Sequence, residues 1–167
     1  LAGTIGDLAA IARFEPDGGI VLAGVVGGPG DTSARLTTEL GGRPLPLTDQ
    51  GRGVFLVANR TIMAPIPDDV RAAMHASLNA LGLPPDVATE ASSVIAAPIR
   101  SGGDAIGSLV LLRFGASPPY DEDDGAAVEA LSAAASLVFE RRAVGDELAS
   151  SLARFEGLFE QAPIAMV

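Results

Sequence analysis

Residues 93–112 read SVIAAPIRSGGDAIGSLVLL, and this stretch decides the fold. Two apolar runs flank a glycine-rich turn, a pattern typical of a β-hairpin. A strand alternates its side chains between two faces, and the second run is apolar on both. One face would carry Ile106, Val110 and Leu112, and the other Ala105, Leu109 and Leu111. Because an antiparallel sheet open to water carries polar residues on one face, we predict a sheet that is covered on both sides.

The remaining sequence supplies partner strands and covering helices. Turn residues and apolar runs predict strands at residues 8–14, 20–26, 61–66, 93–100 and 105–114. Pro65 makes the third of these an edge strand. Helical patterns predict helices at about 31–40, 68–81 and 121–161. Residues 50–58 are ambiguous, because VFLV has strand propensity, and a short helix is the favoured interpretation there. This order indicates an α+β fold with an antiparallel sheet, with the middle helices on one face and the alanine-rich start of the last helix on the other.

The composition excludes several classes of function. The chain carries 21 acidic and 11 basic residues, all of the latter arginine, for a net charge of −10. Nucleic acid demands clustered positive charge, so we expect no nucleic-acid partner. The absence of cysteine excludes disulfides, thiolate metal sites and covalently linked bilins. No apolar run reaches the ~18 residues that span a bilayer, so we expect a soluble, cytoplasmic protein without direct membrane contact.

Three stretches together resemble the GAF domain in its actinobacterial sensory form. They are TIGDLAAIARFEPDGGIVL at 4–22, SVIAAPIRSGGDAIGSLVLLRF at 93–114 and PPYDEDDGAAVEALSAAASLVFE at 118–140. The resemblance covers residues 1–144 and implies an antiparallel sheet between helices in a multidomain signalling protein. Relatives bind varied small molecules or none, so the cofactor is left open. The NKFDE-like motif of the cyclic-nucleotide-binding subtype is absent.

The end of the chain resembles a second family. Residues 154–167, RFEGLFEQAPIAMV, are similar to the first helix and first strand of a PAS domain. The two resemblances imply a GAF sensory domain at 1–144, a helical linker at 145–162 and the start of a PAS-like domain at 163–167. An amphipathic helix followed by a frayed tail is the alternative interpretation.

Motifs for catalysis or metal binding are incomplete. The loop GVVGGPGDTS lacks the lysine of a P-loop and the last glycine of G-x-G-x-x-G. In DEDDG at 121–125 the glycine is fifth and Ser132 twelfth, where an EF-hand needs glycine at its sixth position and glutamate at its twelfth. The charges suit a helix N-terminus instead. With no nucleophile beside a base, we expect no catalytic residue, no metal site and no enzyme activity.

His75, the single histidine, is the candidate polar contact for a small-molecule ligand. Together with Met63, Met74 and Leu78 it would line an apolar pocket under the middle helices, because ligand sites combine apolar walls with a few polar groups. One histidine without a second ligand does not predict haem. The alternative is a structural or surface histidine above an ordinary core.

The last predicted helix is long enough to project well beyond a small domain. Residues 121–161 would extend roughly 60 Å at 1.5 Å per residue. Beyond the part occupied by the sheet, a heptad stripe carries the apolar residues Leu137, Val144, Leu148, Phe155 and Leu158, with Arg141 and Ser151 between them. We predict a parallel homodimer in which this stripe pairs and relays a signal. The alternative is a helix that breaks at Gly145–Asp146 and folds back on its own domain.

Three functions remain open from the sequence. The first is a small-molecule-sensing GAF module that acts through its C-terminal helix on a downstream PAS or output domain of the same chain. The second is a ligand-free dimerisation and relay domain. The third, which ranks last, is an enzyme whose site is not recognisable. The resemblance implies a histidine kinase, PPM-type phosphatase or diguanylate cyclase output, and so two-component or cyclic-di-GMP signalling.

Overall fold

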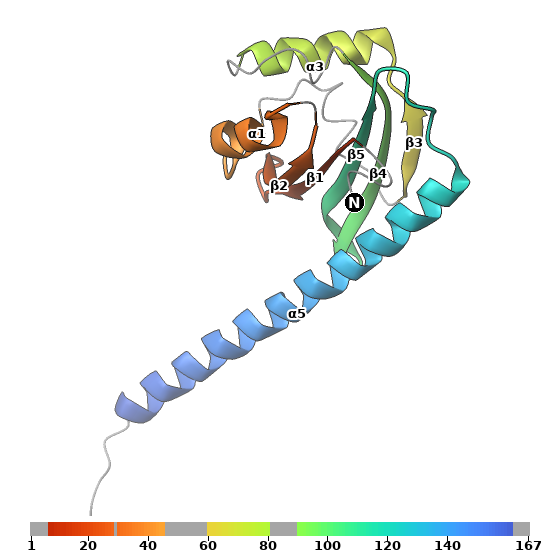
Figure 1. The fold of residues 1–167 in the computed structure, drawn as a ribbon. Helices are drawn as coiled ribbons and strands as arrows, with labels where there is room; N and C mark the ends of the chain where they lie inside the picture. The colour runs from red at the N-terminus through yellow and green to blue at the C-terminus, as the bar shows by residue number, and fades with distance from the viewer. Residues whose placement is uncertain (1–6, 29, 46–59, 81–89, 162–167) are drawn as a thin grey trace, which may run out of the picture.

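A computed structural model describes residues 7–28, 30–45, 60–80 and 90–161, and of residues 77, 78, 80 and 142–161 it describes only the backbone. The described residues form one antiparallel sheet of five strands in the order β2-β1-β5-β4-β3, with helices on both sides (Figure 1). The strands are β1 Leu8–Phe14, β2 Ile20–Gly27, β3 Ile62–Pro65, β4 Ala91–Ser101 and β5 Asp104–Phe114. The helices are α1 Thr32–Leu40, α3 Asp68–Ala80 and α5 Glu122–Gln161. The predicted α+β class is confirmed.

The hairpin from β4 to β5 turns on two glycines. Ser101 pairs with Asp104, and the two residues between them, Gly102 and Gly103, have φ angles of 60° and 95°. Only glycine adopts such angles readily, and positive values at both central positions match the right-handed twist of the strands. The turn that the sequence predicts therefore sets the register of the two longest strands.

Both faces of the sheet are buried, as the sequence predicts. On one face, α1 and α3 cover a first core that contains Leu8, Ala10, Leu22, Leu36, Leu40, Ile66, Val94, Ala96, Val110 and Leu112. On the other face, α5 covers a second core that contains Ile95, Ala97, Ile99, Leu109, Leu111, Tyr120 and Val128. Alternate residues of β4 and β5 divide between the two cores, so each strand contributes to both.

Ile106 corrects one detail of the predicted alternation. Ile99 pairs with Gly107 and Arg100 with Ala105, so Ile106 is an extra residue in β5 at a register shift. An inserted residue of this kind reverses the alternation on one side of the bulge. Ile106 therefore packs against the second core with Leu109, and its predicted place beside Val110 and Leu112 is wrong.

The acidic run before the last helix forms a helix cap. The backbone N–H of Asp124 donates to Oδ1 of Asp121 at 3.0 Å, and the N–H of Asp121 donates to Oδ2 of Asp124 at 3.1 Å. This reciprocal pair is a capping box, which satisfies donors that a helix start leaves open. The helix consequently begins at Glu122 and continues without a break to Gln161.

Most other predicted boundaries agree with the structure to within a few residues. The edge strand at 61–66 is observed at Ile62–Pro65, and the helix at 68–81 at Asp68–Ala80. The predicted helix at 50–58 lies outside the described residues. In the part of the chain that the structure describes, no helix combines the length and apolarity that crossing a bilayer requires.

Gly107 provides a test of the packing at the bulge. A Cβ atom there would lie far inside van der Waals contact with the carbonyl oxygen of Ala12 on β1. We expect Gly107→Ala to lower the free energy of unfolding by about 1–3 kcal/mol, the range typical of overpacking, as measured by urea denaturation. Gly24→Ala is the control, because a Cβ atom at Gly24 on β2 would meet nothing. Equal stabilities for the two variants would contradict this account.

Candidate functional site

The outer edge of β4 is completed by a helix rather than by a strand. β3 pairs with β4 only as far as Ala96. Beyond that point the buried Ser132 of α5 donates its hydroxyl to the carbonyl oxygen of the partly buried Pro98. The N–H of Arg100 donates to the hydroxyl of Ser136 at 2.8 Å. Two serine side chains thus take the place of a neighbouring strand.

A third bond extends this series. The N–H of Gly102 donates to Oε1 of Glu140 at 3.3 Å. Helix residues spaced by four therefore meet strand residues spaced by two. Four helical residues rise about 6 Å and two strand residues about 6.7 Å, so the two repeats nearly match. We call this set of contacts the β4–α5 seam: Pro98 and Arg100 of β4 and Gly102 of the following turn, with Ser132, Ser136 and Glu140 of α5.

A cleft of about 240 Å³ lies beside the seam, at the place where β3 begins. This edge cleft is lined by Arg60, Thr61, Ala97, Pro98, Arg100, Glu129, Ser132, Ala133 and Ser136. Its walls come from the segment leading into β3, from β4 and from α5. Two arginines and one glutamate thus line a small space together with alanine, proline, serine and threonine residues. The guanidinium of Arg100 also donates to the carbonyl oxygen of Gly103 at 3.3 Å.

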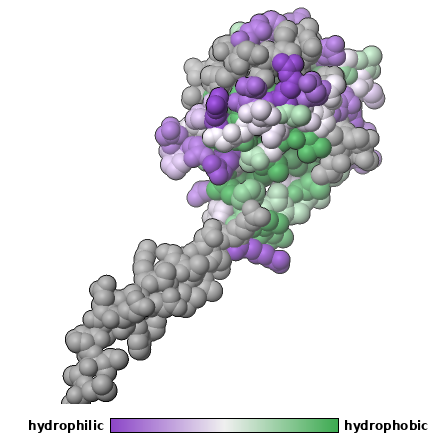
Figure 2. Space-filling view, turned by 60° about the vertical axis from the view of Figure 1, so that its left-hand side comes forward, coloured by the Kyte–Doolittle hydropathy of each residue, from purple (hydrophilic) through white to green (hydrophobic). Residues whose placement is uncertain are grey.

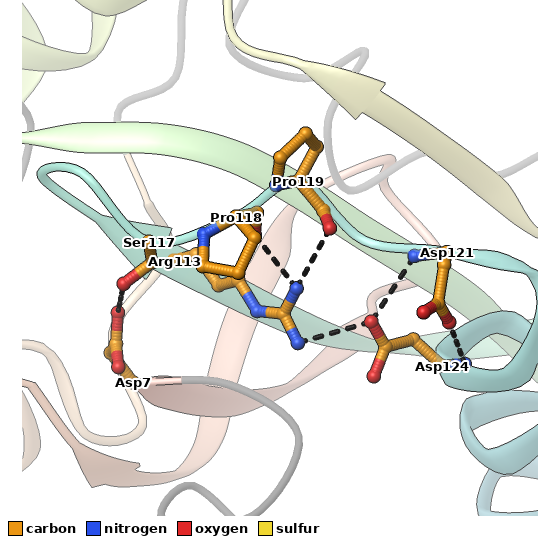
Figure 3. A network of polar contacts seen from close by, with 7 residues as sticks. All are labelled: Asp7, Arg113, Ser117, Pro118, Pro119, Asp121 and Asp124. Atoms are coloured by element: carbon orange, nitrogen blue, oxygen red, sulfur yellow. Dashed lines mark hydrogen bonds and ion pairs between the residues drawn. The ribbon is translucent and has the colours of Figure 1, made fainter.

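A second set of contacts holds the start of α5 (Figure 3). Arg113, at the end of β5, donates to the carbonyl oxygens of Pro118 and Pro119 at 2.8 and 3.0 Å. Its guanidinium also pairs with Asp124 at 3.0 Å and lies 4.2 Å from the centre of the Tyr120 ring. Both side chains of the ion pair are mostly buried, with 15% and 17% exposed. The ion pair and its neighbours form a junction that fixes the helix start against the sheet.

Asp7 ties the N-terminal side of the described chain to the same junction. Its Oδ2 accepts hydrogen bonds from the N–H of Phe114 at 2.8 Å and from the hydroxyl of Ser117 at 3.4 Å. The segment before β1 is thereby attached to the turn between β5 and α5 (Figure 3).

Tyr120 is the buried centre of the junction. Burial raises the pKa of its hydroxyl well above the ordinary value, partly offset by the Arg113 guanidinium, while the Asp7 and Asp124 carboxylates raise it further. The hydroxyl has no hydrogen-bond partner among the described residues. Tyr120 therefore stays neutral at physiological pH and acts here as a packed ring.

The predicted ligand contacts whose side chains the structure describes do not all lie on one face of the sheet. Met74 packs against the first core, and His75 is half-buried, with its Nδ1 3.1 Å from the side-chain nitrogen of Asn79. Met63 is 41% exposed and pairs with Ile95 of the second core, so it lies on the opposite face of the sheet. The side chain of Leu78 lies outside the described residues. Met63, Met74 and His75 are not among the residues that line the edge cleft, and the role of all four residues in ligand binding stays a prediction.

The predicted relay residues all lie on α5. Leu137 is 57% exposed, and the side chains of Val144, Leu148, Phe155 and Leu158 are outside the described residues. The helix passes through residues 145 and 146 without a break and projects away from the sheet (Figure 1). The fold-back alternative is therefore not the conformation of this structure. Apolar surface is visible on the domain next to the place where α5 leaves it (Figure 2).

The residues of the seam and of the edge cleft were not predicted from the sequence. The segment AALSAAASLVF predicts only a face of small residues that allows close packing against the sheet. The available signal was the spacing of Ser132 and Ser136, four residues apart among alanines, which puts both hydroxyls on one side of a helix.

Solved structures share this architecture. No protein-family model and no curated protein matches the sequence. The GAF domain/HD domain protein from Geobacter sulfurreducens aligns at 18% identity and a TM-score of 0.57, covering 83% of each chain. The blue-light absorbing form of the PixJ GAF domain from Thermosynechococcus elongatus aligns at 16% identity and a TM-score of 0.57, covering 89% of this chain and 83% of that one. The chain has the GAF fold.

A third solved structure that aligns with this chain comes from a histidine kinase. It is a domain of a protein described as a two-component sensor histidine kinase from Sinorhizobium meliloti 1021. The identity is 14%, the TM-score is 0.52, and 87% of this chain and 88% of that one are covered. At such identities the likeness concerns the fold, and it agrees with the GAF resemblance of residues 1–144. The predicted PAS-like start at 163–167 lies outside the described residues.

The seam predicts a measurable contribution of two hydroxyl groups. Ser132→Ala and Ser136→Ala leave the Pro98 carbonyl or the Arg100 N–H without its partner, so each should lower the free energy of unfolding by about 1–3 kcal/mol. Thr38→Ala on α1 is the matched control, because it removes a hydroxyl that donates to the carbonyl oxygen of Ala34 in the same helix, at an exposed position. If chemical denaturation shows the serine variants to be as stable as the control variant, the hydrogen bonds of the seam do not contribute to the stability of the fold.

Removal of the Tyr120 hydroxyl should not lower the stability, in contrast to removal of the serine hydroxyls. A buried polar group without a partner costs about 1–3 kcal/mol, so Tyr120→Phe should be as stable as the unmodified protein or more stable. Tyr120→Ala, which also removes the ring, should lose about 3 kcal/mol or more. Thermal and urea unfolding measure both variants. A loss above about 1 kcal/mol in Tyr120→Phe would mean that the hydroxyl has a partner in solution.

Proposed function

We propose that this chain is a small-molecule-sensing regulatory module that passes its state through α5 to a downstream domain of the same protein. The observation that carries the proposal is the β4–α5 seam, together with the unbroken helix that continues from it. A helix joined to a sheet edge by matched hydrogen bonds moves when that edge moves. The remainder of the helix carries this movement away from the domain.

The dimensions of α5 support a relay role. The helix has 40 residues, roughly 60 Å at 1.5 Å per residue. Its packing partners in the second core extend to Phe139, and the seam extends to Glu140. The part beyond these contacts is roughly 30 Å long. A helix that served only to cover the sheet would have no use for this length.

The comparisons support a sensory role by analogy of fold. One protein with this fold is described as absorbing blue light, and another as a sensor histidine kinase. Fold alone does not determine function, so the input and output of this chain are proposals. For the output we keep the kinase, phosphatase or cyclase classes that the GAF resemblance implies, with a PAS-like domain directly after the linker.

A ligand-free dimerisation and relay domain is the second candidate. The observation in its favour is the pair of exposed aliphatic side chains Leu137 and Val138, with 57% and 53% of their surface accessible. Exposed apolar residues next to a heptad stripe favour pairing with a second copy of the helix. Both candidate functions involve a homodimer. They differ in whether binding of a small molecule controls the conformation of that dimer.

The dimer can be tested with charged substitutions. Leu137→Glu and Leu148→Glu should shift the chain from dimer to monomer in light scattering, because each places a carboxylate in the paired stripe. Val26→Glu is the matched control, since Val26 is an equally exposed aliphatic residue, 62% accessible, on β2. A protein that is monomeric at high micromolar concentration before any substitution would contradict the paired relay. So would variants that unfold without a change in association state.

Native mass spectrometry of the purified chain distinguishes the two candidates. We expect an additional small mass that stays with the folded chain and is released on unfolding, because a sensing module retains part of its ligand when affinity is high. A dimer without additional mass would favour the ligand-free domain.

A further inference from the structure

The charge of the edge cleft is opposite to that of the chain. The whole protein has a net charge of −10, but the cleft is lined by two arginines and one glutamate. Arg60 precedes β3, Arg100 belongs to β4 and Glu129 belongs to α5. Three separate segments therefore contribute two arginines and one glutamate to the lining of one space of about 240 Å³.

We propose that the edge cleft binds an acidic α-amino acid. Such a ligand carries two carboxylates and one ammonium group, the charge complement of two guanidinium groups and one carboxylate. Arginine binds carboxylates through two parallel hydrogen bonds, and Glu129 can accept hydrogen bonds from the ammonium group. This inference rests on the proposed sensing function and names the chemical class of its ligand.

The volume of the cleft limits the ligand to a molecule about the size of an amino acid. Sites for drug-sized molecules run from about 300 to 1,000 Å³, and the edge cleft is smaller. The apolar walls of Ala97, Pro98 and Ala133 suit the short methylene chain of an amino acid, and the Thr61 hydroxyl adds one hydrogen-bonding group.

An extended peptide is a poorer occupant of the same place. A peptide strand that continued β3 along β4 would need the edge groups of Pro98 and Arg100, which Ser132 and Ser136 already hold. Compounds that carry only negative groups, such as phosphates, would meet Glu129 without a compensating cation. The two arginines and one glutamate of the cleft therefore favour a zwitterionic compound with a net negative charge.

The bound amino acid would join the sheet to the relay helix. Its carboxylates contact Arg60 and Arg100 on the sheet side, and its ammonium group contacts Glu129 on α5, one turn before Ser132. Binding at these three points adds an interaction across the β4–α5 seam. Occupancy of the cleft thereby changes how firmly the helix is attached to the sheet edge.

Isothermal titration calorimetry tests the inference with L-glutamate and L-aspartate as probes, and with glutarate as the probe that lacks the ammonium group. The variants are Arg60→Gln, Arg100→Gln and Glu129→Gln. The controls Arg35→Gln and Glu39→Gln remove the same charges from exposed positions on α1, a helix on the opposite face of the sheet.

We expect at least one of the two amino acids to bind the unmodified chain. Each arginine variant should weaken that binding by about fivefold or more, as expected for the loss of one charge-assisted hydrogen bond, and the α1 controls should leave it unchanged. Glu129→Gln should weaken the binding of the amino acid but not that of glutarate. Bound L-glutamate or L-aspartate should also slow amide hydrogen exchange at residues 129–136.

The inference is overturned if neither amino acid binds at millimolar concentration, or if the three cleft variants bind as tightly as the α1 controls. Its failure differs from failure of the proposed function. If the chain binds neither amino acid but forms a dimer that Leu137→Glu dissociates, the proposed ligand class is wrong and the paired relay is supported. Binding of L-glutamate to a chain that never dimerises would support the cleft and remove the paired relay.

Discussion

The hydrogen bonds between α5 and the outer edge of β4 are the contacts on which the rest of this structure depends. A sheet edge with open N–H and C=O groups is a template for unwanted pairing, and β3 leaves such an edge beyond Ala96. The hydroxyls of Ser132 and Ser136 close it. They can do so because four residues of a helix and two residues of a strand advance by nearly the same distance. Pro98, which has no N–H, lies where the edge needs only an acceptor satisfied.

The seam would have no strength without the layered packing around it. Residues of β4 and β5 point alternately into the first and second cores, so the central strands are held from both sides. On the second side, Val128, Leu131, Ala135 and Phe139 of α5 lie against the sheet. The small residues between them let the helix approach closely enough for serine hydroxyls, which are short, to reach the strand backbone.

The junction at Arg113 and the β4–α5 seam together hold α5 at two places. The junction fixes the first turn through the mostly buried ion pair with Asp124 and the capping box of Asp121. The seam fixes the next turns as far as Glu140. A helix held at both places follows the sheet as a rigid extension of it. The edge cleft lies beside the seam and shares residues with it, so a bound molecule can act on the helix and on the sheet edge at once.

The sequence alone determined the class of the fold and most of its elements, because these depend on local patterns. Apolar residues at both odd and even positions of 105–112 predict a sheet that is buried on both faces. Gly102 and Gly103 predict a tight hairpin, and the acidic run at 121–124 predicts the start of a helix. Tertiary structure decided the rest. Ile106 faces the second core because the register between β4 and β5 shifts there. The serines become edge partners because β3 begins at Ile62, which pairs with Ala96, and does not extend along the rest of β4. Arg60, Arg100 and Glu129 come together because three segments distant in the sequence meet at one sheet edge, and no local pattern records such a meeting.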